Sequence, residues 1–325
     1  MKLFRRIGPS LTLALLLAAI GLLGLRHDEL LDWVATRGYT PSAAVQNLTA
    51  ETTMTSYAKR LFYANRPAIE DKQVFNQHCT DPSDQVAVLG CFEGDRQGIY
   101  IYDVTDARLS GIEQVTAAHE MLHQAYLRLS RAEKNRINGL LQEYFDLKAS
   151  QELKDKIASY RQSEPDQLQN EMHSIMGTEA SDLPTELEQY YAQYFTDRQK
   201  VLVLHQKYQS EFDSRIAQIN DYDAQLTNLK AQIDAHKKEL TLREQELRQR
   251  RNQMSAYLAA NQISDYNAAV PGFNALVVEY RDLVKTTNQE VNEFNRLLAE
   301  RNALAVQERQ LEDAINSNVS TAPRQ

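Results

Sequence analysis

The stretch GIYIYDVTDARLSGIEQVTAAHEMLHQAYLRL, residues 98–129, decides the fold of this chain. It opens with a β-branched and aromatic run, residues 98–104, which is typical of a strand. After a turn, an apolar stripe at helical spacing predicts a helix from about 112 to 129. Ser110 is a candidate N-cap of this helix, with Glu113 placed as in a capping box. The stretch therefore predicts a strand that leads into a helix.

The predicted helix carries His119, Glu120 and His123 in the pattern His-Glu-x-x-His. Residues i and i+4 lie on one face of a helix, so the two imidazoles can converge on one metal ion. The glutamate between them can reach a metal-bound water as general base. The alternative is a surface helix with two unrelated histidines, but the strand before the helix favours a metal site.

A strand that runs into a His-Glu-x-x-His helix resembles the active-site layout of the zincin metallopeptidases. The resemblance implies Zn²⁺ held by His119 and His123, a zinc-bound water as nucleophile, and Glu120 as its general base. It also implies that the edge of the strand holds an extended peptide. No glycine and third histidine follow His123 as in the metzincins. The layout that remains is that of the gluzincins, in which a downstream helix supplies a glutamate ligand.

The third ligand is predicted in the segment QNEMHSIMGTE, residues 169–179, on a helix that begins near residues 163–166 and ends near Gly177. Glu171 is our first choice, because its Asn-Glu pair is similar to the third-ligand helix of several gluzincins. His173 could be the ligand instead, or could act catalytically by donating a hydrogen bond to a tetrahedral intermediate. Glu179 could also ligate, although its place past the expected helix end favours a structural role.

The first residues have the pattern of a membrane signal anchor. A basic stub, residues 1–6, precedes residues 7–25, which carry no charge and are long enough to cross a bilayer as a helix. Positive charge before the apolar run predicts a single-pass membrane protein with a cytoplasmic N-terminus and an extracytoplasmic catalytic domain. The alternative is a cleavable signal peptide, but no convincing cleavage site follows the apolar run.

The chain has two cysteines, Cys79 and Cys91, with the turn-forming residues 81–84 between them. In an exported domain, such a close pair predicts a disulfide bond. The alternative is a second metal site that includes His78 and Cys79. That site would have too few well-spaced ligands, so we expect the disulfide.

The remaining sequence divides into regions. Residues 26–75 are expected to be a helical N-terminal segment, and residues 76–195 a zincin-like metallopeptidase domain. Residues 196–317 contain two heptad runs separated by a breaker at 261–272, which predicts an antiparallel coiled-coil hairpin. Residues 318–325 are expected to be a disordered tail. We therefore expect a mainly α protein with a small β-sheet, in which a zincin-like α+β domain precedes a long antiparallel coiled coil.

Composition limits the function. A net charge of −8 argues against a nucleic-acid partner, and 42% hydrophobic residues are sufficient for a core. We expect a zinc endopeptidase acting on extracytoplasmic or membrane-proximal proteins. Its partners would be a peptide or protein substrate, the membrane, and a protein that binds the coiled coil. The alternative is a non-enzymatic scaffold with a degenerate zincin-like domain. Glu120 favours the enzyme, because a structural metal site needs no base between its ligands. No segment identifies the substrate.

Overall fold

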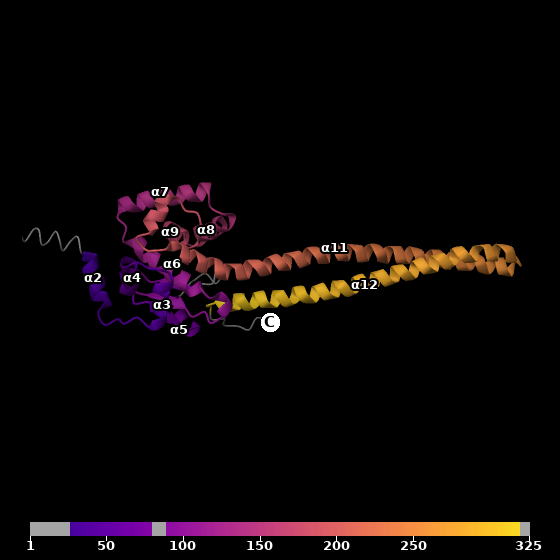
Figure 1. Ribbon diagram of the computed structural model, residues 1–325, viewed down its shortest axis with the longest axis horizontal. Coiled ribbons are helices and arrows are strands. Elements are labelled where there is room, and N and C mark those ends of the chain that lie inside the picture. Colours follow the sequence, from indigo (N-terminus) through magenta and orange to yellow (C-terminus); the bar gives the residue numbers. More distant parts are fainter. Residues whose placement is uncertain (1–26, 80–88, 319–325) are drawn as a thin grey trace, which may run out of the picture. The chain divides into compact units, whose positions relative to one another are not determined.

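The computed structural model describes residues 27–79 and 89–318. The prediction of a mainly helical chain with a small sheet is confirmed, and two long helices occupy its C-terminal part (Figure 1). The chain divides into two compact units. The first unit comprises Met1–Glu211 and Glu312–Gln325, and the second unit is the intervening Phe212–Leu311.

Short helices make up most of the first unit. They are α2 (His27–Thr36), α3 (Ala43–Glu51), α4 (Ser56–Ala64), α5 (Lys72–His78), α6 (Ile112–Leu127), α7 (Arg131–Leu147), α8 (Gln151–Ser163), α9 (Leu168–Glu179) and α10 (Thr185–Tyr191). Three of these helices have a hydroxyl residue as N-cap: Ser42 for α3, Thr55 for α4 and Ser130 for α7. The side chain of each accepts a hydrogen bond from a backbone N–H of the first turn. These caps satisfy donors that have no partner within the helix.

The sheet has three short strands, β1 (Ala68–Glu70), β2 (Gly90–Phe92) and β3 (Ile99–Tyr102), in the order β1-β3-β2. The predicted strand is confirmed as β3, whose buried Ile99 and Ile101 alternate with half-buried tyrosines. β1 pairs with β3 in parallel and β2 pairs with it antiparallel. The prediction that this strand offers its edge to a peptide is therefore wrong, since both its edges are paired. Among the described strands, β2 lies at the edge nearest α6.

Helix α6 is the predicted His-Glu-x-x-His helix, and most of its residues are buried. It packs against β2 and β3 on one side and against α9 on another. The predicted N-cap at Ser110 is wrong. Gly111 is the N-cap instead, in the left-handed region at φ 110°, and Glu113 accepts a hydrogen bond from the Val104 N–H at 3.0 Å. A side chain at Gly111 would also meet the Leu204 carbonyl at 2.9 Å, so only glycine fits this turn.

Helix α9 differs from its predicted bounds at both ends. Residues near 163 end α8 instead of starting α9, which begins at Leu168. Gly177 lies inside α9 rather than after it. A Cβ at Gly177 would lie 2.5 Å from Leu122 Cδ1 and 2.7 Å from Tyr191 Cε1. The glycine is therefore there for the close approach of α9 to α6, and not to end a helix.

Helices α11 (Arg198–Ala259) and α12 (Ile263–Ile315) form the second unit between residues 212 and 311, which we call the hairpin. Within it the helices run side by side in opposite directions (Figure 1). Tyr222 Oη donates to Glu300 at 2.9 Å, and His236 Nδ1 lies 2.8 Å from Glu290 Oε2. Apolar residues of the two heptad runs are buried between the helices, among them Leu226, Ile233, Met254, Leu276 and Leu297, and the polar Thr287 is buried with them.

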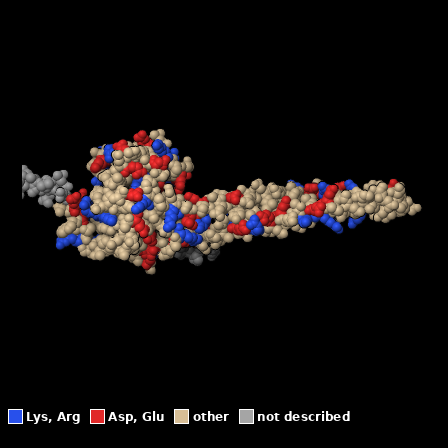
Figure 2. All heavy atoms as spheres, viewed as in Figure 1, with Lys and Arg blue, Asp and Glu red and all other residues tan. Residues whose placement is uncertain are grey.

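The breaker was predicted too long. The turn comprises only residues 260–262, with Asn261 in the left-handed region at φ 56°, and Pro271 lies inside α12. A proline removes one backbone donor, and neighbouring packing can keep the helix going past that loss. Charged residues cover most of the hairpin, but the end of the hairpin that contains the turn is almost uncharged (Figure 2).

The segment after the hairpin belongs to the first unit and contacts α5. Lys72 Nζ donates a hydrogen bond to the Asn316 carbonyl at 2.7 Å, and Asn76 donates one to the carbonyl of the buried Ser317. The first unit is thus built from two separate parts of the sequence. Most of the predicted tail, residues 319–325, lies outside the described residues.

The prediction of a single-pass membrane protein is not supported and is corrected. The predicted anchor, residues 7–25, lies outside the described residues. Within residues 27–79 and 89–318, no helix combines the length and the apolar character needed to cross a bilayer. The helices that are long enough, α11 and α12, carry charged side chains along most of their length.

Candidate metal centre

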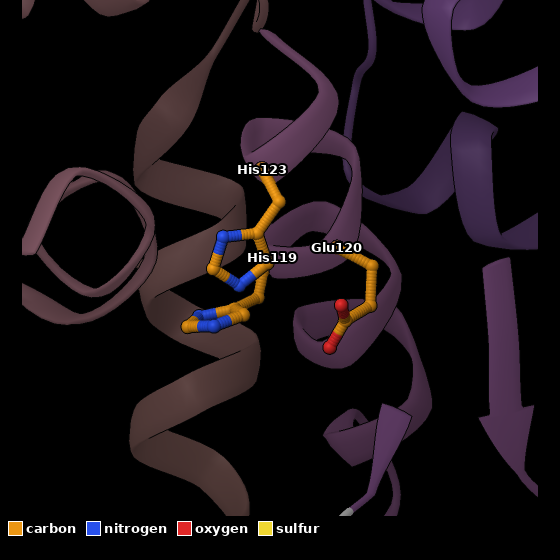
Figure 3. A group of neighbouring side chains, drawn as sticks. All are labelled: His119, Glu120 and His123. Carbon is orange, nitrogen blue, oxygen red and sulfur yellow. The ribbon is translucent and has the colours of Figure 1, made fainter. Parts of the chain in front are cut away.

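His119 and His123 lie one turn apart on α6 and face the same way. Their rings meet edge to face with centroids 4.7 Å apart, and Figure 3 shows both imidazoles on one side of the helix. His123 is buried, and the side chain of His119 keeps 16% of its surface exposed. His119, Glu120 and His123 bring potential ligand atoms within 4.8 Å of one another. This group could hold a metal ion.

Glu171 reaches both histidines from α9. Its Oε2 lies 3.5 Å from His119 Nε2, and its Oε1 lies 3.4 Å from His123 Nε2. The Oε2 atom is buried and has no hydrogen-bond partner among the described residues. A buried carboxylate oxygen without a partner is costly unless something else neutralises it. A cation between the three side chains would do so, and the two-histidine, one-carboxylate set is one that zinc accepts.

Glu120 is the other carboxylate near the histidines, and one of its oxygens lies within 4.8 Å of their potential ligand nitrogens. Figure 3 shows its carboxylate beside the two rings. The carboxylate also lies under β2, because a Cβ at Gly90 would be 2.8 Å from Glu120 Oε1. Of the two carboxylates, Glu171 is the better placed to be a ligand, because its oxygens lie 3.5 and 3.4 Å from the two histidine nitrogens, and Glu120 lies between the histidines and the edge strand.

Burial and charge set the protonation of these groups. Burial raises the pKa of Glu120 to about 7, with a further contribution from Glu171. Burial lowers the pKa of His123 to about 4, so its ring is neutral, as a metal ligand must be. Burial alone would lower the pKa of His119 and raise that of Glu171, but their mutual attraction outweighs burial and shifts both the opposite way.

The edge strand β2 is fixed next to this site. Cys79 and Cys91 form the predicted disulfide, with Cα atoms 5.8 Å apart, which ties β2 to the end of α5. The ring of Phe92 lies parallel to His123, with centroids 6.3 Å apart. Residues on both sides of Cys91 thus contact the His-Glu-x-x-His helix. The alternative of a second metal site at His78 and Cys79 is excluded, because Cys79 is in the disulfide.

His173 lies elsewhere. It is completely buried, its Nε2 is 2.8 Å from Tyr190 Oη, and Tyr191 donates a hydrogen bond to its carbonyl. On a helix, residues i and i+2 point to nearly opposite sides, so His173 cannot share the face of Glu171. The placement does not support the predicted role as ligand or as catalytic donor, and it is that of a core histidine.

Glu179 does not lie with the histidines either. Its Oε2 pairs with Lys156 Nζ at 2.6 Å and lies 3.6 Å from His205 Nε2. These residues line a polar cavity of about 210 Å³ between α8, the end of α9 and the start of α11. Among the predicted third ligands, Glu171 is therefore the one that the fold brings to both histidines.

Two residues near the site were missed in the sequence. Ser174 Oγ lies 3.2 Å from His123 Nδ1, and both groups are buried. The signal was available, because Ser174 is three residues after Glu171 and so shares its helix face. Tyr160 on α8 is the other: burial, followed by the charges of Glu171 and Glu120, raises its pKa and keeps the phenol protonated. Nothing in the sequence around Tyr160 indicated this location.

The chain was compared with models of known protein families, with curated proteins and with solved structures, and none of them matches.

Proposed function

We propose that this chain is a zinc-dependent endopeptidase, with zinc held by His119, His123 and Glu171. The observation that carries the proposal is that α6 presents two potential metal ligands together with a separate carboxylate that can act as a base. The two histidines face Glu171, while Glu120, beside them on α6, lies against the edge strand. A metal site that is only structural needs no carboxylate at that position. The bound zinc would supply Lewis acidity to a water molecule and to the substrate carbonyl.

The residues of the chain would then divide the remaining work. Glu120 accepts a proton from the attacking water and passes it to the leaving amine. Burial raises the pKa of Glu120, and a group that acts first as a base and then as an acid works best when its pKa is near the ambient pH. Tyr160 keeps its proton and can donate a hydrogen bond near the carboxylates.

Peptide binding is assigned to β2. β2 pairs with β3 on one side, and the described residues include no strand on its other side. An extended peptide can add to such an edge through backbone hydrogen bonds, which are independent of the peptide sequence. Gly90 keeps this backbone close to Glu120, so a peptide bond beside β2 would lie near both the base and the histidines.

The test is Glu120→Gln in the full chain, with zinc content and peptide cleavage measured side by side. The amide keeps the shape of the side chain but cannot accept the proton. We expect wild-type zinc content and a loss of cleavage of roughly 10²-fold to 10⁴-fold, the usual contribution of a general base. Glu143→Gln is the matched control, because Glu143 is exposed on α7. Full activity of Glu120→Gln would refute the peptidase.

The hairpin favours a second role in partner binding. Between Arg251 and Glu279 the sequence has one charged residue, Asp265. Leu258 and Ile263 at the turn are about half exposed, at 48% and 49%. Depletion of charge together with exposed apolar side chains is characteristic of protein interfaces. We propose that the end of the hairpin binds a protein, either a substrate or a scaffold partner.

A further inference from the structure

His123, the second histidine of the metal group, has a neighbour that contacts the ring nitrogen facing away from Glu171. Ser174 Oγ lies 3.2 Å from His123 Nδ1, in a completely buried position on α9. The other ring nitrogen, Nε2, lies 3.4 Å from Glu171 Oε1. The two nitrogens of one imidazole thus meet different partners on the same helix, one turn apart.

These two partners make different demands on the proton of the ring. A neutral imidazole has one N–H and one acceptor nitrogen. An ionised carboxylate only accepts hydrogen bonds, so Glu171 favours the proton on Nε2 when no metal is present. A metal ion needs the lone pair of Nε2, which places the proton on Nδ1. A partner that must serve both states has to donate to Nδ1 in one and accept from it in the other.

A hydroxyl can do both, because it carries one donor and two acceptor positions and rotates freely. We propose that Ser174 is a positioning residue for His123, whose hydroxyl donates to Nδ1 in the metal-free protein and accepts from Nδ1–H once Nε2 binds the metal. One proton leaves Nε2 and one arrives at Nδ1 through solvent, so the ring stays neutral. The inference rests on the metal role of His123 in the proposed function, but not on peptide cleavage.

The neighbouring hydroxyl of Thr178 provides a matched control. It is also buried on α9, one turn further on, and it donates to the Ser174 carbonyl at 2.9 Å without contacting His123. Thr178→Val therefore removes a buried hydroxyl from the same helix and leaves the His123 contact in place. Ser174→Ala removes the hydroxyl that contacts the ring, and alanine is well tolerated inside a helix.

The experiment measures zinc affinity by competition with a chromophoric chelator for the wild type, Ser174→Ala and Thr178→Val. Loss of a hydrogen bond to a ligating histidine typically weakens metal binding about 10-fold to 100-fold. We expect a loss in that range for Ser174→Ala and near wild-type affinity for Thr178→Val. Long-range proton–nitrogen NMR on histidine-labelled protein adds a second readout. The His123 proton should move from Nε2 to Nδ1 when zinc is added.

The outcomes separate the inference from the proposed function. Equal zinc affinity of the wild type and Ser174→Ala, or an equal loss in Thr178→Val, would overturn the role of Ser174. A metal-free ring already protonated on Nδ1 would overturn it too. If the wild type binds zinc in a Ser174-dependent way but cleaves no peptide, the inference stands and the peptidase falls. A wild type that binds no zinc would remove both.

Discussion

Replacing Gly90 with alanine tests the contact between the edge strand and Glu120 with a single added carbon. The new Cβ would lie 2.5 Å from Thr116 Cγ2 and 2.8 Å from Glu120 Oε1, where ordinary contacts begin at 3.4 Å. Either β2 must therefore move by about 0.9 Å, or Thr116 must move by that amount and the Glu120 carboxylate by about 0.6 Å. A displacement of that size in a catalytic group can cost on the order of 100-fold in rate. The nearest atoms to the added Cβ belong to Thr116 and Glu120 and not to the proposed zinc ligands, so zinc content should not change.

We therefore expect Gly90→Ala to lower kcat on a fluorogenic peptide library about 100-fold while zinc per chain stays at the wild-type value. Overpacking should also lower the free energy of unfolding by about 1–3 kcal/mol, which calorimetry would detect as a lower Tm. Gly139→Ala is the control, because its Cβ would meet nothing within 4 Å in the middle of α7. That variant should keep its activity and gain up to about 1 kcal/mol. Wild-type kcat in Gly90→Ala would refute the proposed arrangement of β2 and Glu120.

Three further predictions follow from the site and the hairpin. Glu171→Ala should weaken zinc binding more than about 100-fold, because removing a ligand costs more than removing a hydrogen-bond partner of a ligand. Glu179→Ala should keep the wild-type zinc affinity. If chelator competition gave the reverse result, Glu179 and not Glu171 would be the third ligand. Burial lowers the pKa of His173 from 6.5 to about 3, so only the unfolded chain takes up this proton between those values. The wild type should lose about 1.4 kcal/mol of stability per pH unit as the pH falls below 6.5, relative to His173→Gln in urea unfolding; parallel pH profiles would contradict this. Replacing residues 212–311 with a short Gly-Ser linker should leave zinc binding and cleavage of short peptides intact but abolish partner binding, and loss of zinc would show that the first unit needs the hairpin.

Local patterns in the sequence predicted the elements that depend on local rules. The strand β3, the helix α6 and the buried leucines of the hairpin follow from alternation and from helical and heptad spacing. The His119 and His123 pair was predictable for the same reason, since four residues make one turn. The disulfide was predictable because the chain has only two cysteines with a turn between them.

The errors arose where tertiary packing overrides a local signal. Gly177 was predicted to end a helix, but it permits the approach of α9 to Leu122. Ser110 was a good N-cap by type, yet the turn needs the positive φ that Gly111 provides. Pro271 was assigned to the break, whereas Asn261 makes the turn. The strand β1 is three residues long and exists only because β3 pairs with it.

The choice between Glu171 and His173 shows the same limit within the site. Both residues are on α9, and both residue types bind zinc. The helical phase of α9 separates them, since Glu171 faces His119 while His173 is enclosed by tyrosines from α6 and α10 and by Tyr194. That phase depends on how α9 packs on α6, which no spacing within the segment reveals.

The return of residues 312–318 to α5 has a consequence for the order of folding during synthesis. The hydrogen bond from Lys72 to Asn316 closes a loop of 244 residues. Helix hairpins form from local contacts and fold quickly, so the two helices of residues 212–311 can pair before this loop closes. Once the hairpin has formed, its 100 residues no longer count as flexible chain, and the loop is shortened to roughly 144 residues. The entropic cost of closing the loop falls by only about 0.5 kcal/mol. The α5 end of the first unit therefore stays incomplete on the ribosome until residues 312–318 have emerged.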